Sequence, residues 1–338
     1  MKKEFKRKLI IGFSIGDVNG IGPEILLKSL INSDILKYCI PIVFCDKSVL
    51  SFYKHLYGFK LNISRIKNLN QSYNDETLYC FENKKINFKI RLGKVNRASG
   101  DYSIHSLINA INFLKEKKIE GLVTLPINKE NSQSEKFKFP GHTEFLEKSF
   151  NSKESMMIMY SKKMILGLVS GHIPLINIKD YLNLKIISNK IELFINTLKK
   201  DFKIQNPRVA LLGINPHAGE NGLLGTEEID IINPLLIKFN ENKKILYGPY
   251  PADSFFGLKK YSEFDGVLSY YHDQGLIGFK TVSFEDGVNY TAGLPYIRTS
   301  PDHGTAYNIS GKGIASEISL TESIKLNIKI LKNRRAQK

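Results

Sequence analysis

The chain has 338 residues, 42% hydrophobic and 24% charged, a balance typical of globular proteins with room for a large core and two domains. Its net charge is +16, but the lysines are spread along the chain, and only residues 2–8 and 332–338 are densely basic. A solvated lysine-rich surface is therefore favoured over a nucleic-acid interface, and a basic nucleic-acid-binding protein stays a remote alternative.

The cysteines and the start of the chain indicate the cellular compartment in which the protein is expected. Cys39, Cys45 and Cys80 are odd in number and lack C-x-x-C spacing, which predicts reduced thiols and no disulfide framework. The basic, apolar start imitates a signal peptide, but Asp17 interrupts the apolar run and no cleavage site of small residues follows. No apolar stretch approaches the roughly 18 residues that predict a membrane span. We expect a cytoplasmic protein without a membrane partner.

Short apolar runs alternate with longer helical patterns along the chain. In chain order, the predicted strands are 9–15, 40–45, 121–127, 156–160, 164–170, 208–214 and 266–271. Helical patterns between them include 22–33, 103–118 and 184–200. This alternation predicts an α/β architecture with largely parallel strands. The segment 287–313 is rich in Gly, Pro, Asn and Thr and predicts a long functional loop.

Three of the seven histidines share a context. His172, His217 and His272 each follow a predicted strand and are flanked by Gly, Pro or Asp. Ligands of open α/β sheets gather outside the carboxyl ends of strands, and neutral imidazole is the commonest side-chain ligand of transition metals. The pattern indicates a three-histidine metal site, with separate turn histidines as the alternative. His55 and His105 lie in helical patterns and are expected to be ordinary solvated or core residues.

Other motifs exclude several classes of site. "GDVNGIGPE" (16–24) follows the first strand but does not fit G-x-G-x-x-G, "SGKGIAS" (310–316) is not a Walker loop, and no G-x-S-x-G is present. Arginine is scarce, so Arg298 is a candidate for a bidentate contact with phosphate or carboxylate. A loop-bracing ion pair is the alternative for Arg298.

Nine motifs follow one another between residues 16 and 316. They include "GDVNGIGPE", "FPGHTEFL", "SGHIPL", "NPHAGENGLLGTEE", "YHDQGLIGFK" and "GVNYTAGLPYIRTSPDHGTA". Together they resemble the 4-hydroxythreonine-4-phosphate dehydrogenase family of pyridoxal phosphate biosynthesis. The resemblance implies a two-domain α/β/α fold similar to that of isocitrate and isopropylmalate dehydrogenases. It implies a nucleotide-side domain of residues 1–130 plus 285–338, and a metal-binding and dimerisation domain of residues 131–284.

The resemblance also implies site residues. A divalent metal (zinc, cobalt or magnesium) is expected on His172, His217 and His272, at a site shared between the subunits of a homodimer. The substrate contacts implied are His142, Thr143, Lys280, Asn289 and Arg298. Residues 302–316 resemble the adenine-binding loop of the related dehydrogenases, which implies cofactor contacts from His303, Gly304, Thr305, Ala306 and Asn308. Asn308 stands where NAD-using isopropylmalate dehydrogenases carry an aspartate, so NADP stays open beside NAD.

The implied reaction is a metal-dependent oxidation of 4-phosphooxy-L-threonine by NAD(P), followed by decarboxylation to 3-amino-2-oxopropyl phosphate. The alternatives are a paralogue that oxidises a four-carbon acid-sugar phosphate or a terephthalate dihydrodiol, and a catalytically silent metal-binding scaffold. Asp253, Asp273 and Lys129 are candidates for the general base, and the sequence does not choose among them.

Overall fold

The computed structural model describes residues 7–82, 85, 87–134, 137–139 and 141–337. They form two compact units. Unit 1 contains the described residues up to Asn151 together with Pro295–Lys332. Unit 2 contains Ser152–Leu294 together with the described residues after Lys332. Within the described part of the chain, no helix has the length and apolar character needed to cross a bilayer.

Unit 1 is built on a parallel sheet with the strand order β3-β4-β2-β1-β5-β12. Strand β1 is buried along its whole length, as expected for a parallel strand covered on both faces. The strands are β1 (Leu9–Ser14), β2 (Cys39–Phe44), β3 (Asn62–Ile66), β4 (Thr77–Phe81), β5 (Gly121–Thr124) and β12 (Ile297–Pro301).

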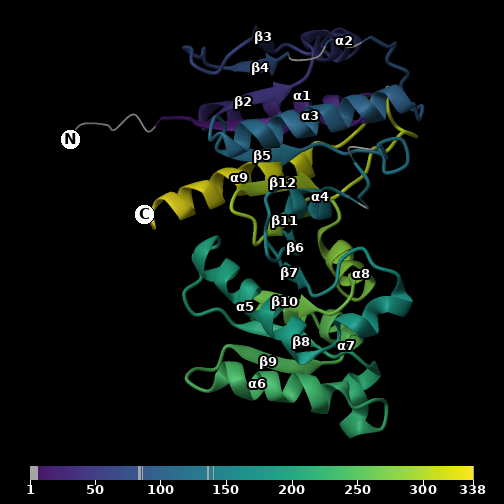
Figure 1. The fold of residues 1–338 in the computed structure, drawn as a ribbon, viewed down its shortest axis with the longest axis vertical. Coiled ribbons are helices and arrows are strands. Elements are labelled where there is room, and N and C mark those ends of the chain that lie inside the picture. Colours follow the sequence, from purple (N-terminus) through teal and green to yellow (C-terminus); the bar gives the residue numbers. More distant parts are fainter. Residues whose placement is uncertain (1–6, 83–84, 86, 135–136, 140, 338) are drawn as a thin grey trace, which may run out of the picture. The chain divides into compact units, whose positions relative to one another are not determined.

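Side-chain caps explain where two helices of unit 1 begin. The Asp46 carboxylate accepts a hydrogen bond from Ser48 N, and the Asn96 side chain accepts one from Ala98 N. The helices are α1 (Gly22–Ile31), α2 (Lys47–Tyr57), α3 (Arg97–Lys115), α4 (His142–Ser149) and most of α9 (Ile318–Arg335), with the 3₁₀ turn η1 at Ile35–Lys37. Figure 1 draws the chain from purple through teal and green to yellow, so α9 is the yellow helix.

Unit 2 has the strand order β11-β6-β7-β10-β8-β9. Strands β7, β10, β8 and β9 are parallel to one another, whereas β6 runs antiparallel to both β7 and β11. The strands are β6 (Met156–Tyr160), β7 (Ile165–Leu168), β8 (Val209–Leu212), β9 (Leu246–Tyr250), β10 (Gly266–Ser269) and β11 (Val288–Ala292).

A core of apolar side chains joins the sheet of unit 2 to its helices. Leu166, Val267 and Ala210 from neighbouring strands pack with Phe255 and Phe279 from two helices. The helices and turns are α5 (Leu184–Lys200), α6 (Asn233–Asn240), α7 (Ala252–Gly257), α8 (His272–Ser283), η2 (Leu175–Tyr181), η3 (Pro216–Gly222), the π-helical η4 (Glu228–Ile232) and η5 (Lys260–Glu263).

The predicted α/β architecture with largely parallel strands is confirmed, and each of the seven predicted strands is present. The predicted long loop at 287–313 is wrong in its first half. Strands β11 and β12 occupy this region because their Val, Tyr, Thr and Ile residues are buried, and Gly293 and Pro295 lie in the turn between the two strands. Arg298 therefore lies in a strand, and the irregular segment begins after β12.

Candidate functional site

The three strand-end histidines lie along one edge of the sheet in unit 2. Strands β7, β10 and β8 are neighbours and parallel, so their carboxyl ends meet at the same edge. His172 follows β7, His217 follows β8 in η3, and His272 is the first residue of α8 after β10. This is the edge at which open α/β sheets bind ligands.

Two of these histidines are neighbours. The ring centroids of His172 and His272 are 5.4 Å apart, and both line a cavity of about 1020 Å³ together with Asp253. Asp273 Oδ1 lies 2.6 Å from His272 Nδ1, an arrangement in which a carboxylate fixes the tautomer of an imidazole. Among the described residues, no three His, Cys, Asp or Glu side chains are grouped closely enough to hold a metal ion. The described part of one chain therefore brings together the imidazoles of His172 and His272, and His217 does not join them to form a group of three metal ligands.

His217 lies in a turn with an unusual backbone. His217, Ala218, Glu220 and Asn221 have φ angles of 53°, 52°, 42° and 55°, and Gly219 between them has φ 82°. A left-handed conformation costs an L-residue about 1–2 kcal/mol, so consecutive residues keep it only where the surrounding structure imposes it. Such strained residues are concentrated at functional sites. The side chain of His217 is exposed on this turn.

Glu228 is the buried group beside this turn. Its Oε1 accepts hydrogen bonds from Ile214 N and Asn215 N, both at 2.7 Å, and its Oε2 accepts one from Asn215 Nδ2 at 2.9 Å. A Cβ atom on Gly219 would lie 2.6 Å from Oε2, so the carboxylate packs directly on that glycine. Burial, and then the charge of Glu228, raise the pKa of Tyr270.

Gln274 links the segments that carry two of the histidines. Its Nε2 donates to Gly213 O at 2.5 Å, and its Oε1 accepts from Tyr270 N at 2.9 Å. The sequence pattern does not distinguish Gln274 or Glu228, although Glu228 ends the motif "NPHAGENGLLGTEE" and Gln274 lies in "YHDQGLIGFK". Only their hydrogen bonds to backbone groups distant in sequence distinguish them from other polar residues.

In unit 1, Arg298 lies on β12 and is buried, with 2% of its surface exposed. Its Nε and Nη2 donate to Thr124 Oγ1 at 3.0 and 2.7 Å, at the end of the neighbouring strand β5. Burial lowers the pKa of Arg298 to about 9, and the Glu144 carboxylate opposes this shift. A guanidinium presents paired, planar donors that match the oxygens of a phosphate or a carboxylate, which makes this position a candidate anion site.

His142 lies close to this cation. It is the first residue of α4, and its buried Nε2 has no hydrogen-bond partner among the described residues. Burial, together with the positive charges of Arg298 and Lys129, holds the pKa of His142 well below its ordinary value of 6.5. A neutral imidazole can donate or accept one hydrogen bond at Nε2, and such an unpaired buried atom suits contact with a ligand.

The other predicted substrate residues are distributed between the units. Thr143 follows His142 on α4 in unit 1. Lys280 lies on α8 and Asn289 on β11, both in unit 2, and Asn289 Nδ2 is 3.2 Å from Met157 Sδ. The candidate bases also divide, since Asp253 and Asp273 line the histidine cavity and Lys129 lies near His142.

The segment 302–316 is the irregular connection between β12 and α9. It contains the predicted cofactor residues His303, Gly304, Thr305, Ala306 and Asn308. Thr305 O accepts a hydrogen bond from Ile21 N at 3.0 Å, and His303 Nδ1 is 3.2 Å from Gly304 O. Tyr307 OH donates to Asp17 Oδ2 at 2.9 Å. The buried Asp17 carboxylate also accepts from Ser99 Oγ and from Asn131 Nδ2, so the connection is fixed on the turn after β1.

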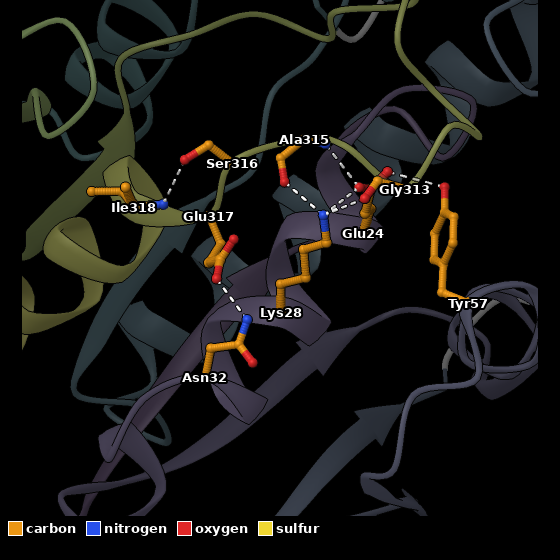
Figure 2. A network of polar contacts seen from close by, with 9 residues as sticks. All are labelled: Glu24, Lys28, Asn32, Tyr57, Gly313, Ala315, Ser316, Glu317 and Ile318. Atoms are coloured by element: carbon orange, nitrogen blue, oxygen red, sulfur yellow. Dashed lines mark hydrogen bonds and ion pairs between the residues drawn. The ribbon is translucent and has the colours of Figure 1, made fainter.

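Figure 2 shows a second anchor of the same connection. The fully buried Glu24 accepts hydrogen bonds from Lys28 Nζ at 2.8 Å, from Ala315 N at 3.0 Å and from Tyr57 OH at 3.0 Å. Lys28 Nζ also donates to the carbonyl oxygens of Gly313 and Ala315. Ile314, between these two residues, is 65% exposed. These hydrogen bonds fix the backbone of this segment on α1.

Comparison with known proteins identifies relatives along nearly the whole chain. A 4-hydroxythreonine-4-phosphate dehydrogenase from Bacteroides thetaiotaomicron is 41% identical over 335 residues, covering 98% of this chain and 92% of the relative. A D-threonate 4-phosphate dehydrogenase from Cupriavidus necator is 36% identical over 318 residues, covering 94% of this chain and 95% of that protein.

Solved structures agree with the fold. The crystal structure of a 4-hydroxythreonine-4-phosphate dehydrogenase from Klebsiella pneumoniae matches with a TM-score of 0.80 and 32% identity, covering 96% of this chain and 100% of that one. An isocitrate dehydrogenase from Methylococcus capsulatus shares the fold at 11% identity, with a TM-score of 0.52 and coverage of 97% and 87%. The predicted isocitrate dehydrogenase-like fold is confirmed.

The family resemblance predicted from the motifs is confirmed as well. A family model described as pyridoxal phosphate biosynthetic protein PdxA matches residues 37–327, which include the histidine edge, Arg298 and the whole connection between β12 and α9. The chain belongs to the family of the pyridoxal phosphate biosynthetic protein PdxA.

Proposed function

We propose that the chain catalyses the oxidation of 4-phosphooxy-L-threonine by NAD, followed by decarboxylation to 3-amino-2-oxopropyl phosphate, in pyridoxal phosphate biosynthesis. The observation that carries this proposal is the buried Arg298 guanidinium close to His142, whose pKa is held well below 6.5, a pair of groups suited to binding an anion. The two relatives described above are both named as dehydrogenases of four-carbon compounds with a 4-phosphate group.

A divalent metal, with zinc, cobalt and magnesium as candidates, is proposed on His172, His217 and His272. The donor chemistry fits, because His172 and His272 are adjacent imidazoles on a cavity at the ligand-binding edge of the sheet. Bound there, the metal supplies positive charge that polarises the oxygen of the reacting hydroxyl and of the ketone that replaces it.

The same site is proposed to be shared between the subunits of a homodimer. His217 does not complete a three-ligand group within one chain, in the part that the structure describes. Leu175 and Ile277 line the cavity with 76% and 69% of their surface exposed, which favours a partner copy that buries them.

The roles of the remaining residues follow from their chemistry. Arg298 would bind two oxygens of the substrate phosphate, and His142 and Thr143 would add hydrogen bonds from the first turn of α4. Lys280 and Asn289 are proposed as further substrate contacts, and His303, Gly304, Thr305, Ala306 and Asn308 as cofactor contacts. A nicotinamide cofactor held there would supply the hydride acceptor, and Asp253, Asp273 and Lys129 are candidates for the base that would take the hydroxyl proton.

A second candidate substrate is a four-carbon acid-sugar phosphate, favoured by the similarity to D-threonate 4-phosphate dehydrogenase. A terephthalate dihydrodiol lacks the phosphate that would match Arg298. We place the activity in the cytoplasm, because Cys39, Cys45 and Cys80 are free and buried thiols, as expected in a reducing compartment.

The test is NADH formation by the purified protein with 4-phosphooxy-L-threonine and with D-threonate 4-phosphate, each with zinc, cobalt or magnesium. NADP is tested in parallel with NAD. We expect the higher kcat/KM with 4-phosphooxy-L-threonine. A higher kcat/KM with D-threonate 4-phosphate would assign the second function. If neither substrate led to reduction of NAD or NADP, the chain would be a catalytically silent metal-binding scaffold.

A further inference from the structure

The backbone before and within the left-handed turn is fixed by one carboxylate. One oxygen of Glu228, Oε1, accepts hydrogen bonds from the consecutive backbone N–H groups of Ile214 and Asn215. These residues connect the end of β8 to Pro216 and His217, so the carboxylate sets the path of the chain into the turn. With 3% of its surface exposed, Glu228 is not a solvated surface residue.

The second oxygen of Glu228 fixes the other side of His217. It accepts a hydrogen bond from Asn215 Nδ2 and lies against Gly219, which has a positive φ of 82°. Any side chain at position 219 would collide with the carboxylate, since a Cβ would be only 2.6 Å from Oε2. Glu228 thus contacts the chain on both sides of His217 without contacting the imidazole itself in any described hydrogen bond.

We propose that Glu228 is a positioning residue for His217, holding the left-handed turn in the conformation that presents the imidazole to a divalent metal. The inference rests on the proposed function, because it takes His217 as a metal ligand. It goes beyond that function by assigning a role to a buried carboxylate that would touch neither metal nor substrate. Groups that orient metal ligands typically change metal affinity by about 10- to 100-fold when they are replaced.

The first test is Glu228→Gln. A glutamine has one acceptor oxygen and one NH₂ group, so the NH₂ would face Asn215 Nδ2, another donor, in a buried place. The matched control is Glu227→Gln. Glu227 Oε2 also accepts from Asn215 Nδ2, at 2.7 Å, but Glu227 is only half-buried, and no hydrogen bond to Ile214 N or Asn215 N is described for it.

Three quantities are measured on the full-length protein: the Kd of Co²⁺ by calorimetry, hydrogen exchange of the 213–222 backbone without metal, and kcat as a function of Co²⁺ concentration. We expect Glu228→Gln to raise the Kd by about 10- to 100-fold, to speed hydrogen exchange in 213–222, and to regain kcat at saturating Co²⁺. Glu227→Gln should stay close to wild type in all three.

Gly219→Ala gives an independent route if Glu228→Gln does not fold. Its methyl group would displace the carboxylate, and the same rise in Kd is expected. An unchanged Co²⁺ affinity in either folded variant would overturn the inference.

His217→Ala separates this failure from failure of the proposed function. If His217→Ala loses Co²⁺ and Glu228→Gln does not, only the positioning role is wrong. If neither variant loses Co²⁺, His217 is not a ligand, and both proposals fail at this residue.

Discussion

At the scale of single residues, Arg298 is a buried guanidinium near the Glu144 carboxylate, and its planar pair of donors matches two oxygens of a phosphate. Arg298→Lys keeps a charge but removes the planar pair of donors. We expect kcat/KM for the phosphorylated substrate to fall by about ten- to a hundred-fold, the usual cost of a charge-assisted contact of 1.5–3 kcal/mol. Steady-state kinetics with the phosphorylated substrate and with its dephosphorylated analogue measure this effect.

The control for this change is Arg65→Lys, since Arg65 lies on β3 with a side chain that is 49% exposed. It should leave kcat/KM unchanged, and Arg298→Lys should leave metal affinity unchanged. Equal losses with the phosphorylated and the dephosphorylated compound would show that Arg298 binds the carboxylate instead.

His142 should make stability depend on pH. Burial and the charges of Arg298 and Lys129 hold the pKa of His142 well below 6.5 in the folded protein. Below pH 6.5 the unfolded chain therefore binds a proton at this residue that the folded protein does not, and the free energy of unfolding falls as the pH falls towards the folded pKa. Above pH 6.5 the contribution is constant.

The variant His142→Gln lacks this titration. Between about pH 7.5 and about pH 5.5 its free energy of unfolding should fall less than that of the wild type, as measured by denaturant titration. The same fall in both proteins would mean that His142 does not titrate with a lowered pKa.

Some single residues could be identified from the sequence and others could not. His172 and His272 were recognisable because each follows a strand, and strand ends of a parallel sheet gather at one edge. Glu228 could not be recognised, because its partners Ile214 and Asn215 meet it only through the fold of the intervening turn. Nor does any pattern reveal that His217 has a left-handed backbone.

At the scale of elements, the connection after β12 is held by the ion pair of the buried Glu24 and the partly buried Lys28 (Figure 2). Glu24→Gln leaves Lys28 without its counter-charge, and removing one partner of a buried pair typically costs about 3–5 kcal/mol. Because Glu24 and Lys28 both bind the backbone beside Ile314, we also expect a higher KM for NAD with unchanged metal affinity. Thermal unfolding and cofactor kinetics measure the two effects.

Asp101→Asn serves as the comparison for this ion pair. Asp101 and Arg97 form a pair on α3 with side chains 45% and 58% exposed, and such pairs contribute at most about 1 kcal/mol. If Glu24→Gln weakened the protein but left the KM for NAD unchanged, the connection would not be a cofactor loop.

The elements themselves were predictable where composition was unambiguous. Apolar runs such as 9–15 and 266–271 became strands buried on both faces. Strands β11 and β12 were missed because Gly293 and Pro295 in the turn between them, with Asn and Thr around, give the whole segment a loop-like composition. Burial by neighbouring strands, which a local pattern does not contain, decides the structure there.

At the scale of the whole molecule, the proposed metal site requires two chains. His172 and His272 are neighbours within a chain, so His217 would come from the partner. Co-expression of a His217→Ala chain with a His272→Ala chain should then give mixed dimers in which one of the two sites is intact. Metal content and NADH formation of the isolated mixed dimers measure this restoration.

A second mixture makes the assignment specific. Chains with His172→Ala and His272→Ala should not complement each other, because both residues belong to the same half of the site. Restored activity in this second mixture would contradict the proposed division of the ligands between the two chains. The same holds if the first mixture forms mixed dimers but regains neither metal nor activity. The sequence alone could suggest three ligands but not which of them are neighbours.

The most direct test of the proposed activity is one spectrophotometric measurement. Metal-free protein is mixed with 4-phosphooxy-L-threonine and NAD, NADH absorbance is followed, and Co²⁺ is then added. We predict no NADH before the addition and steady NADH formation after it, with release of carbon dioxide in equal amount. NADH formed at the same rate before and after the addition, or none at all with metal present, would contradict a metal-dependent oxidation at the histidine edge.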